Sequence, residues 1–363
     1  MTNIMDYLKW RGDLPLEKIP LCDVDYLVLC RVAYIKMSGI VPASFVEEPM
    51  EMADMAGEVI KRNLAAKDDA ALLKALGGCK RFRNLKLLGH VDVLDDDEQE
   101  QFSAVTALLP DGSMVIVYRG TDSSITGWKE DFNMGFADNV PAQQDAAQYI
   151  EKAAAQITGI PIRICGHSKG GNLAVYSAAF CAEEIQSRIL EVRNFDGPGF
   201  NEKNIHLPGV RRISEKARTY LPQSSIVGML LEHEEAFTIV HSKSLGIFQH
   251  DLYSWQIEGG DFVTESKTTG SSQFIDSTLK EWLNGMSPEK RESFINGVFA
   301  LVGHCDATTL REIWRGRNAV TILRTLASMD ESTRGVILEG LSILKKSAKK
   351  SLAQMMDNNT KGG

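Results

Sequence analysis

The sequence predicts an α/β protein with a mostly parallel central sheet, preceded by a helical segment and followed by a helical extension. Between residues 85 and 257, short apolar runs alternate with helical patterns, whereas residues 14–84 and the region after 269 carry helical patterns throughout. A Gly-x-Ser-x-Gly sequence joins one apolar run to the helix after it. Strands and helices in turn, with crossovers of this length, are typical of parallel strands covered on both faces.

The elements are predicted from periodicity and turn residues. Helices are expected before the sheet at 24–35, 43–62 and 68–76, within it at 141–157 and 169–189, and after it from Ser287-Pro288-Glu289 and at 330–356. Strands are expected at 85–93, 102–109, 113–118, 160–165, 191–195, 217–221, 236–241 and 252–257. The chain then divides into a helical segment that packs on the core (1–84), the core (85–268), a helical region (269–358) and a flexible tail (359–363).

Composition is that of a soluble globular protein. The chain has 363 residues, 44% apolar and 24% charged, which is enough apolar material for a large core. A net charge of −8 argues against general binding of nucleic acid. We expect no signal peptide and no membrane span, because the longest uncharged apolar stretch, 173–182, is about half the ~20 residues that a span needs. Six cysteines without a C-x-x-C pair predict reduced thiols in a cytoplasmic protein.

Ser168 is the predicted nucleophile. It is the centre of Gly166-His167-Ser168-Lys169-Gly170, in which glycines on both sides leave room for a tight, strained turn from a strand into a helix. An apolar strand is expected before the motif and a helix of small residues after it, over 173–180. A hydroxyl at such a turn lies at a helix N-terminus, where the backbone N–H of Lys169 supplies half of an oxyanion hole. The alternative is a glycine-rich turn that merely joins the two elements.

A second oxyanion donor is expected at Thr121. The apolar strand 115–118 ends at Gly120 and presents Thr121, whose backbone N–H would face a tetrahedral intermediate. The alternative is an ordinary polar turn in which Arg119 forms a salt bridge.

Several motifs, in this order, resemble the class 3 lipase branch of the α/β-hydrolases. They are Arg119-Gly-Thr121, Trp128-x-x-Asp131, Gly166-His-Ser-Lys-Gly-Gly171 and Asn194-Phe-Asp-Gly-Pro-Gly-Phe200. More narrowly, the elbow and the segments 6–13 (DYLKWRGD), 222–228 (PQSSIVG) and 249–255 (QHDLYSW) resemble an uncharacterised bacterial lipase-like family. Together these motifs cover most of residues 4–257. The resemblance implies an α/β-hydrolase fold and ester hydrolysis.

His250 is the predicted general base. On this fold the order along the chain is Ser, acid, His, which leaves four candidates after the elbow: His233, His241, His250 and His304. His250 lies in a predicted turn at the late edge of the sheet, where the histidine loop of this fold belongs, and the resemblance to the Gln-His-Asp segment agrees. His233 is second, inside the acidic run 232–235. His241 sits at a strand end and is typical of a core histidine.

Asp196 is the predicted acid, at the end of the strand 191–195. The resemblance to class 3 lipases implies an Asp after the strand 217–221, but Ser225 occupies that place here. Asp196 has glycines around it that leave room for the base, although it also suits a turn cap. Glu232 and Glu234 in the later loop remain alternatives. Asp251 adjoins His250 and is poorly placed to orient its ring.

The sequence therefore predicts a serine hydrolase that cleaves small-molecule or lipid carboxylic esters without a cofactor. Two alternatives stay open: a thioesterase or amidase with the same nucleophile, and a degenerate fold that serves as a binding or scaffold module. Lys169 replaces the usual apolar residue after the nucleophile. Its ammonium either favours an acidic or phosphorylated substrate or pairs with Asp122 or a Glu. The lysines of 345–350 either make weak contact with anionic lipid or complete a solvated helix. The oligomeric state is not predicted.

Overall fold

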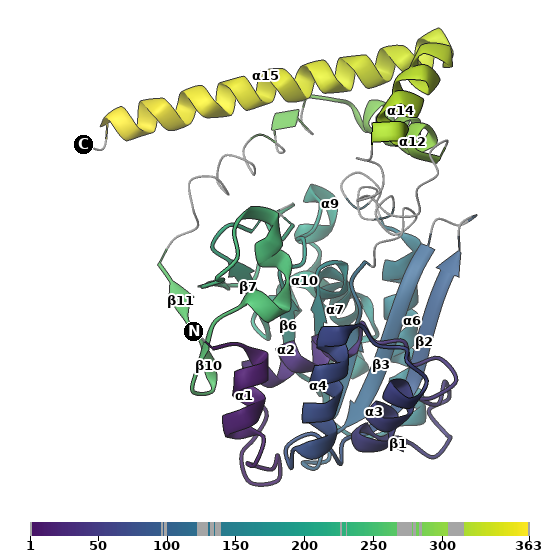
Figure 1. The fold of residues 1–363 in the computed structure, drawn as a ribbon, viewed down its shortest axis with the longest axis vertical. Coiled ribbons are helices and arrows are strands. Elements are labelled where there is room, and N and C mark those ends of the chain that lie inside the picture. Colours follow the sequence, from purple (N-terminus) through teal and green to yellow (C-terminus); the bar gives the residue numbers. More distant parts are fainter. Residues whose placement is uncertain are drawn as a thin grey trace.

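A nine-stranded mixed sheet forms the centre of the molecule (Figure 1). The computed structural model describes residues 2–95, 97, 100–121, 130, 134, 139–225, 227–229, 231–266, 278, 281–282, 285–303 and 316–361. The strand order is β1-β2-β3-β4-β5-β6-β7-β8-β11. The four pairs that join β4 to β8 are parallel, and the remaining pairs of the sheet are antiparallel.

The strands are β1 (Met50–Glu51), β2 (Lys86–Asp95), β3 (Glu100–Leu108), β4 (Met114–Tyr118), β5 (Ile162–His167), β6 (Ile189–Phe195), β7 (Ala217–Pro222), β8 (Phe237–Val240) and β11 (Thr264–Glu265). A separate hairpin consists of β9 (Ile257–Glu258) and β10 (Asp261–Phe262).

Helices cover both faces of the sheet, because its inner strands are apolar on both sides. The N-terminal helices α1 (Ile4–Arg11), α2 (Asp23–Val32), α3 (Met52–Lys61) and α4 (Lys67–Gly78) share a hydrophobic cluster with one face. Helices α6 (Pro141–Gln156), α7 (Lys169–Phe180) and α10 (Pro208–Ser214) share a second cluster with the other face. Val115 and Val117 of β4 belong to the first cluster and Ile116 to the second, as the alternation of side chains along a strand requires.

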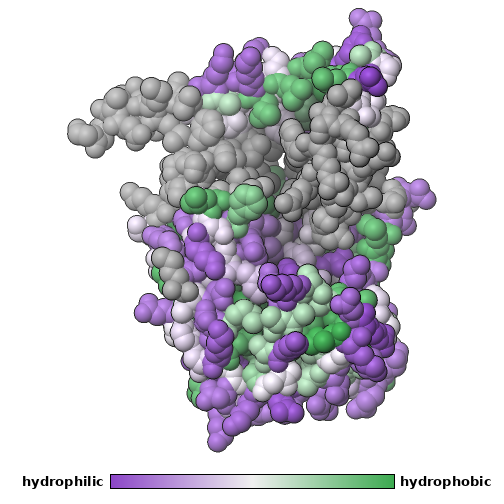
Figure 2. All heavy atoms as spheres, in the orientation of Figure 1, coloured by the Kyte–Doolittle hydropathy of each residue, from purple (hydrophilic) through white to green (hydrophobic). Residues whose placement is uncertain are grey.

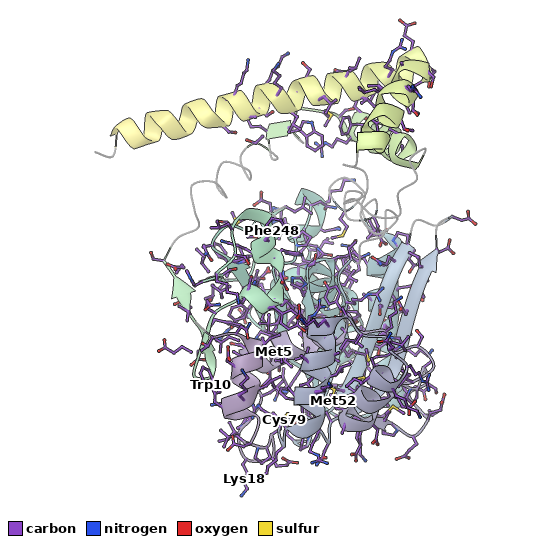
Figure 3. All side chains as sticks on the ribbon, viewed as in Figure 1. Met5, Trp10, Lys18, Met52, Cys79 and Phe248 are labelled. Carbon is purple, nitrogen blue, oxygen red and sulfur yellow. The ribbon has the colours of Figure 1, made fainter. Side chains whose placement is uncertain are left out.

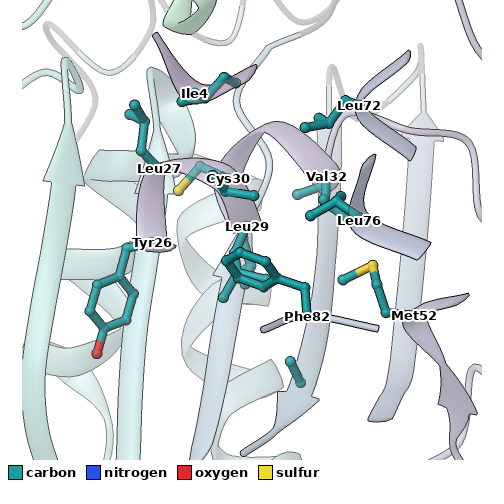
Figure 4. Packing of buried hydrophobic residues seen from close by; sticks show 14 of the residues in the cluster. Ile4, Tyr26, Leu27, Leu29, Cys30, Val32, Met52, Leu72, Leu76 and Phe82 are labelled. Carbon is teal, nitrogen blue, oxygen red and sulfur yellow. The ribbon is translucent and has the colours of Figure 1, made fainter. Parts of the chain in front are cut away.

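Helix α2 lies at the centre of the first cluster, where Figure 4 shows its side chains among those of α3, α4 and Phe82. Leu27, Leu29, Cys30 and Val32 are buried. This packing ties the N-terminal helices to the sheet through apolar contacts, which contribute about 1.5–3 kcal/mol for each fully buried large side chain.

The predicted α/β-hydrolase fold is confirmed: five parallel strands are covered on both faces, and β5 leads through Ser168 directly into α7. Two predicted elements are wrong in their bounds. The helix expected from 43 begins only at Met52, since the residue before Pro49 is biased away from helix and 50–51 pair with β2 instead. The helix expected over 169–189 is broken at the extended residue Cys181, and α8 (Glu183–Arg188) follows.

The predicted strand 252–257 is also wrong. Residues Leu252–Ser254 form a short 3-10 turn, capped by the Asp251 side chain, which accepts a hydrogen bond from the N–H of Tyr253. His250 therefore does not lie in a hairpin turn. It ends a preceding 3-10 helix, Gly246–His250.

The C-terminal helices have a hydrophobic cluster of their own and lie apart from the sheet in Figure 1. They are α12 (Pro288–Gly303), α14 (Gly316–Ser328) and α15 (Glu331–Lys361). Helix α15 runs through residues 359–361, which were expected in a flexible tail. No helix in the described ranges combines the length and apolarity needed to cross a membrane. Hydrophilic side chains predominate over the N-terminal helices in Figure 2, with smaller apolar areas between them.

Candidate active site

Ser168 occupies a strained turn between β5 and α7. Its backbone angles, φ 60° and ψ −134°, lie in a region that few residues other than glycine adopt. A Cβ at Gly166 would lie 1.9 Å from the carbonyl oxygen of Gly170, so the turn closes only with glycine at position 166. The N–H of Ser168 donates to the carbonyl of Phe195 at 2.9 Å, which fixes the turn against the end of β6. These contacts hold Ser168 above the carboxyl edge of the sheet.

The two predicted oxyanion residues flank this turn. A Cβ at Gly120 would lie 2.8 Å from Cβ of Ser168, so the chain at the end of β4 passes directly beside Ser168 and leads into Thr121. Lys169 is the first residue of α7, where backbone N–H groups have no partner within the helix. Arg119 pairs with Asp92 at 2.9 Å, the salt bridge that was the alternative reading of this turn. The salt bridge is therefore observed, and the role of Thr121 as an oxyanion donor stays a prediction.

His250 and Asp196, 54 residues apart in the chain, are in direct contact. Nδ1 of His250 lies 2.6 Å from Oδ2 of Asp196, whose carboxylate is fully buried. Oδ1 of Asp196 accepts hydrogen bonds from the Ser225 hydroxyl and, at 3.2 Å, from the N–H of Gly228. The carboxylate thus orients the ring of His250 in the tautomer that leaves Nε2 without a proton.

Asp196 and His250 lie at the same edge of the sheet as Ser168. A Cβ at Gly197, the residue after Asp196, would lie 2.4 Å from the carbonyl oxygen of Ser168. Figure 3 labels Phe248, two residues before His250, at the edge of the core that faces the C-terminal helices. Among the described residues, neither the hydroxyl of Ser168 nor Nε2 of His250 has a hydrogen-bond partner, and such bonds often tighten only with substrate present.

His167 and Tyr34 complete the surroundings of His250, and the sequence predicts neither contact. Nε2 of His167 lies 2.9 Å from the carbonyl oxygen of His250, and its Nδ1 lies 2.8 Å from the hydroxyl of Tyr34. The two histidine rings are 4.4 Å apart between centroids. Burial, reinforced by repulsion from His250, holds the pKa of His167 well below its usual range, so this ring is neutral. Tyr34 comes from the N-terminal segment, and no local motif indicates it.

The ammonium of Lys169 is buried rather than directed at a substrate. It binds Oε2 of Glu130 at 2.5 Å and the carbonyl oxygen of Gln101 at 2.7 Å, and both charged side chains are at most 1% exposed. Glu130 also accepts hydrogen bonds from the N–H groups of Gln101 and Ala142. Of the two expectations for this side chain, pairing with a Glu is the one observed. The expected preference for an acidic or phosphorylated substrate loses its basis.

The other candidate residues lie elsewhere or outside the described ranges. His233 contacts Glu235 at 2.9 Å and the carbonyl oxygen of Gly228 at 2.8 Å, and His241 contacts Glu265 at 2.7 Å. Glu232 and Glu234 are exposed. Residues Asp122, Trp128, Asp131 and His304 are not among those that the structure describes. Within those it does describe, no three His, Cys, Asp or Glu side chains are grouped as metal ligands.

Ser225 is the most informative residue whose role was missed. The sequence indicates Ser225 only as a replacement for the expected acid, yet its hydroxyl donates to Asp196. The motif Pro222–Gly228 contains both donors to Oδ1 of Asp196, which are Ser225 and Gly228. The resemblance therefore indicates the segment that binds this carboxylate. The contact itself depends on the position of β7 beside β6.

Lipases are among the solved structures to which this chain is similar. The structure of the chain is similar to that of a Rhizomucor miehei lipase in complex with its propeptide. The two chains are 16% identical, the match covers 59% of this chain and 66% of that chain, and the TM-score is 0.39. A fungal lipase has 11% identity over 74% and 91%, with a TM-score of 0.40. A variant of MDLA from Penicillium cyclopium has 10% identity over 67% and 85%, with a TM-score of 0.38. No curated protein matches the sequence.

The family assignment comes from the sequence itself. The model of the Mbeg1-like family matches residues 76–300, which include the elbow at Ser168, the strand end at Asp196 and the loop of His250. The narrower resemblance to a bacterial lipase-like family stays a prediction. Because the match spans well over half of the sequence, the chain belongs to the Mbeg1-like family.

Proposed function

We propose that the protein is a serine hydrolase of carboxylic esters, with Ser168 as nucleophile, His250 as general base and Asp196 as the acid that orients it. The observation that carries the proposal is the 2.6 Å contact between Asp196 and His250, at the sheet edge where Ser168 occupies a strained turn. A buried carboxylate bound to one ring nitrogen of a histidine beside such a serine is the arrangement that nucleophilic acyl transfer requires.

In the first half of the reaction, Oγ of Ser168 attacks the ester carbonyl carbon while Nε2 of His250 takes the hydroxyl proton. The electron pair of the carbonyl double bond moves to its oxygen, and the backbone N–H groups of Lys169 and Thr121 stabilise the resulting oxyanion. When this intermediate collapses, the bond to the alcohol oxygen breaks, and the alcohol leaves with the proton from Nε2. An acyl group remains on Ser168.

In the second half, water repeats the attack. Nε2 of His250 takes a proton from the water as its oxygen bonds to the acyl carbon. Collapse of the second intermediate breaks the bond to Ser168, which recovers the proton from Nε2 and releases the carboxylic acid. In both halves the negative Asp196 stabilises the imidazolium of His250, and the neutral ring of His167 adds no opposing charge beside it.

Reaction with a fluorophosphonate probe tests the nucleophile. We expect the purified protein to be labelled once per chain at Ser168, and the Ser168→Ala variant to remain unlabelled. Ser187→Ala is the matched control, because Ser187 is an exposed serine on α8 whose hydroxyl contacts only the carbonyl of Glu184 in the described chain. Absence of labelling in the folded wild type would overturn the proposal and favour the scaffold alternative.

Hydrolysis of p-nitrophenyl esters of increasing chain length tests the substrate class. We expect turnover that depends on Ser168, and the preferred acyl length separates a lipase from a short-chain esterase. Matched thioester and amide substrates are the comparison. Faster turnover of a thioester or amide, relative to the rates of these bonds in water, would replace the ester assignment while leaving the nucleophile in place.

A further inference from the structure

We propose that His233 and Glu235 form a positioning pair for the triad acid: through Gly228, they fix the carboxylate of Asp196 in the orientation that aligns His250. This inference rests on the proposed function and deepens it. It concerns residues that do not touch a substrate. His233 acts through the backbone of Gly228, and Gly228 acts through Asp196.

A continuous chain of hydrogen bonds links the two histidines. The hydroxyl of Thr219 donates to Glu235, and Oε1 of Glu235 lies 2.9 Å from Nδ1 of His233. Nε2 of His233 lies 2.8 Å from the carbonyl oxygen of Gly228. The N–H of Gly228 donates both to Oδ1 of Asp196 at 3.2 Å and to Oγ of Ser225 at 3.1 Å. Oδ2 of Asp196 then contacts Nδ1 of His250 at 2.6 Å. Gly228 is thus held on both sides, by His233 at its carbonyl and by Asp196 at its N–H.

The loop between β7 and β8 depends on these contacts for its position. Gly228 packs so closely on Asp196 that an added Cβ would lie 2.5 Å from Oδ1 and 2.3 Å from a methyl group of Leu221. A shift of this loop by a fraction of an ångström would therefore change the direction of the N–H that holds the carboxylate. Ser225, the other donor to Oδ1, lies on the same loop and would move with it. Catalysis is sensitive to displacements of this size.

The protonation state of His233 suits this role. Burial by itself would lower the pKa of His233, but the hydrogen bond and the charge of Glu235 outweigh it, and the pKa is raised. Burial would likewise raise the pKa of Glu235, yet the same partner lowers it to about 2. The charged groups that face His233 are Glu235 and Glu232, both on its own loop, while β7 contributes the Thr219 hydroxyl. Only the protonated ring donates to both Glu235 and Gly228, because a neutral ring has one N–H.

The matched control is the second His–Glu pair at this end of the sheet. His241 contacts Glu265 at 2.7 Å, but both side chains are about one-third or more exposed. Neither belongs to the hydrogen-bond chain that leads to Asp196. His241→Gln removes a comparable pair and is expected to leave activity unchanged.

The experiment measures kcat and KM for p-nitrophenyl butyrate in three proteins: the wild type, His233→Ala and His241→Gln. We expect His233→Ala to lower kcat about ten- to a hundredfold, with KM within about twofold, because positioning of the acid affects the transition state and not substrate binding. Wild-type kcat in a folded His233→Ala variant would overturn the proposal.

A second variant guards against misfolding, since His233→Ala leaves Glu235 buried without a partner. The double variant His233→Gln/Glu235→Gln keeps two hydrogen-bonding side chains without charge. We expect its kcat to be reduced. Because Gln at position 233 does not titrate, this kcat should not vary with pH through that residue. In the wild type, kcat should fall as the pH rises through the pKa of His233. In Glu235→Gln this fall should move to lower pH, because the charge that favours protonation is gone. A fall of kcat that stays at the same pH in Glu235→Gln would contradict the proposal. If the pair had a merely structural role, this substitution would not shift the pH of the fall.

A readout without turnover separates this inference from the proposed function. The proton between Nδ1 of His250 and Asp196 is expected to give a far-downfield NMR signal in the wild type. We expect the signal to shift or broaden in His233→Ala and to stay unchanged in His241→Gln. If the wild type neither hydrolyses the ester nor reacts with the probe, the proposed function fails. In that case the NMR signal alone still tests whether His233 positions Asp196. An unchanged signal in His233→Ala overturns that role.

Discussion

Asp196 combines an unusual backbone conformation with its contact to His250. Its φ is 53°, in the left-handed region where Asp and Asn are tolerated better than most residues. This conformation turns the chain at the end of β6 so that the side chain meets the loop after β7 and the loop of His250. The segment Asn194-Phe195-Asp196-Gly197 therefore forms the turn at the end of β6 and also supplies the carboxylate that contacts His250.

Substitution of Asp196 by Asn tests its role with little change in shape. Asn keeps the left-handed backbone, but its amide no longer stabilises a charged ring and permits the wrong tautomer of His250. We expect kcat for p-nitrophenyl butyrate to fall by about 10⁴-fold, with a nearly unchanged urea midpoint. Asp251→Asn is the control, because Asp251 is exposed and caps the next turn. A kcat for Asp196→Asn within tenfold of the wild type would refute the assignment.

Three elements meet at the buried pair of Lys169 and Glu130. Glu130 binds the backbone at the start of β3 and at the start of α6, while Lys169 begins α7. The pair thus connects the chain between β4 and α6 to the elbow. Since each charge is fully buried, either one alone carries a large desolvation penalty.

The stability of single and double variants measures this penalty. We expect Lys169→Met and Glu130→Gln each to lower the free energy of unfolding by about 3–5 kcal/mol, because each leaves one buried charge without a partner. The double variant Lys169→Met/Glu130→Gln should recover most of this loss. Lys61→Met, at an exposed pair with Glu58, should change stability by less than ~1 kcal/mol. Urea unfolding measures all four, and additive losses in the double variant would contradict the interpretation.

The pair of His233 and Glu235, on the loop between β7 and β8, should make the free energy of unfolding depend on pH. The raised pKa of His233 means that its contribution is fully present below about 6.5 and is lost as the pH rises through the folded pKa. The pKa of Glu235, lowered from 4.5 to about 2, means that its contribution is present above 4.5 and is lost as the pH falls toward 2. The pair therefore stabilises most between about pH 4.5 and 6.5.

Urea unfolding across pH checks this window. The difference in unfolding free energy between the wild type and His233→Gln/Glu235→Gln should be largest between about pH 4.5 and 6.5 and should shrink on both sides. The exposed pair of His241 and Glu265 serves as the reference, with a smaller and flatter difference. A difference that does not depend on pH would exclude the charged form of the pair.

The residues that the structure describes form three hydrophobic clusters. Two lie on the two faces of the sheet, and the third joins the C-terminal helices through Trp282, Met286, Phe294, Leu301 and Ile337. Within the third, the indole N–H of Trp282 donates to the carbonyl of Gly340 at 2.9 Å. The candidate active site belongs to the sheet, so the C-terminal cluster contributes none of its described residues.

Loss of packing in the third cluster should therefore leave the reaction intact. Phe294 is buried and packs against Gly340, where a Cβ would lie 2.3 Å from its ring. We expect Phe294→Ala to destabilise the C-terminal helices by about 3–5 kcal/mol and to leave kcat and KM for p-nitrophenyl butyrate unchanged. Circular dichroism during thermal unfolding separates the two parts. A matching loss of kcat would show that the helices act on the site.

Local patterns predicted much of this molecule and failed where a side chain competes locally with the apolar periodicity. The strands β2 to β8 were each expected within a few residues, because alternating apolar side chains between turn residues reflect the sheet directly. The strand expected at 252–257 failed because the Asp251 side chain caps a 3-10 turn there, a local competitor that apolar periodicity does not reveal.

The sequence by itself determined the order of the elements and the elbow at Ser168, because glycine spacing and apolar alternation act over a few residues of chain. Only the tertiary structure decided that Asp196, rather than Glu232 or Glu234, contacts His250, and that Lys169 turns away to Glu130. These contacts join residues 39 to 54 positions apart. They exist because parallel strands bring their carboxyl ends to one edge, where burial makes an unpaired charge costly.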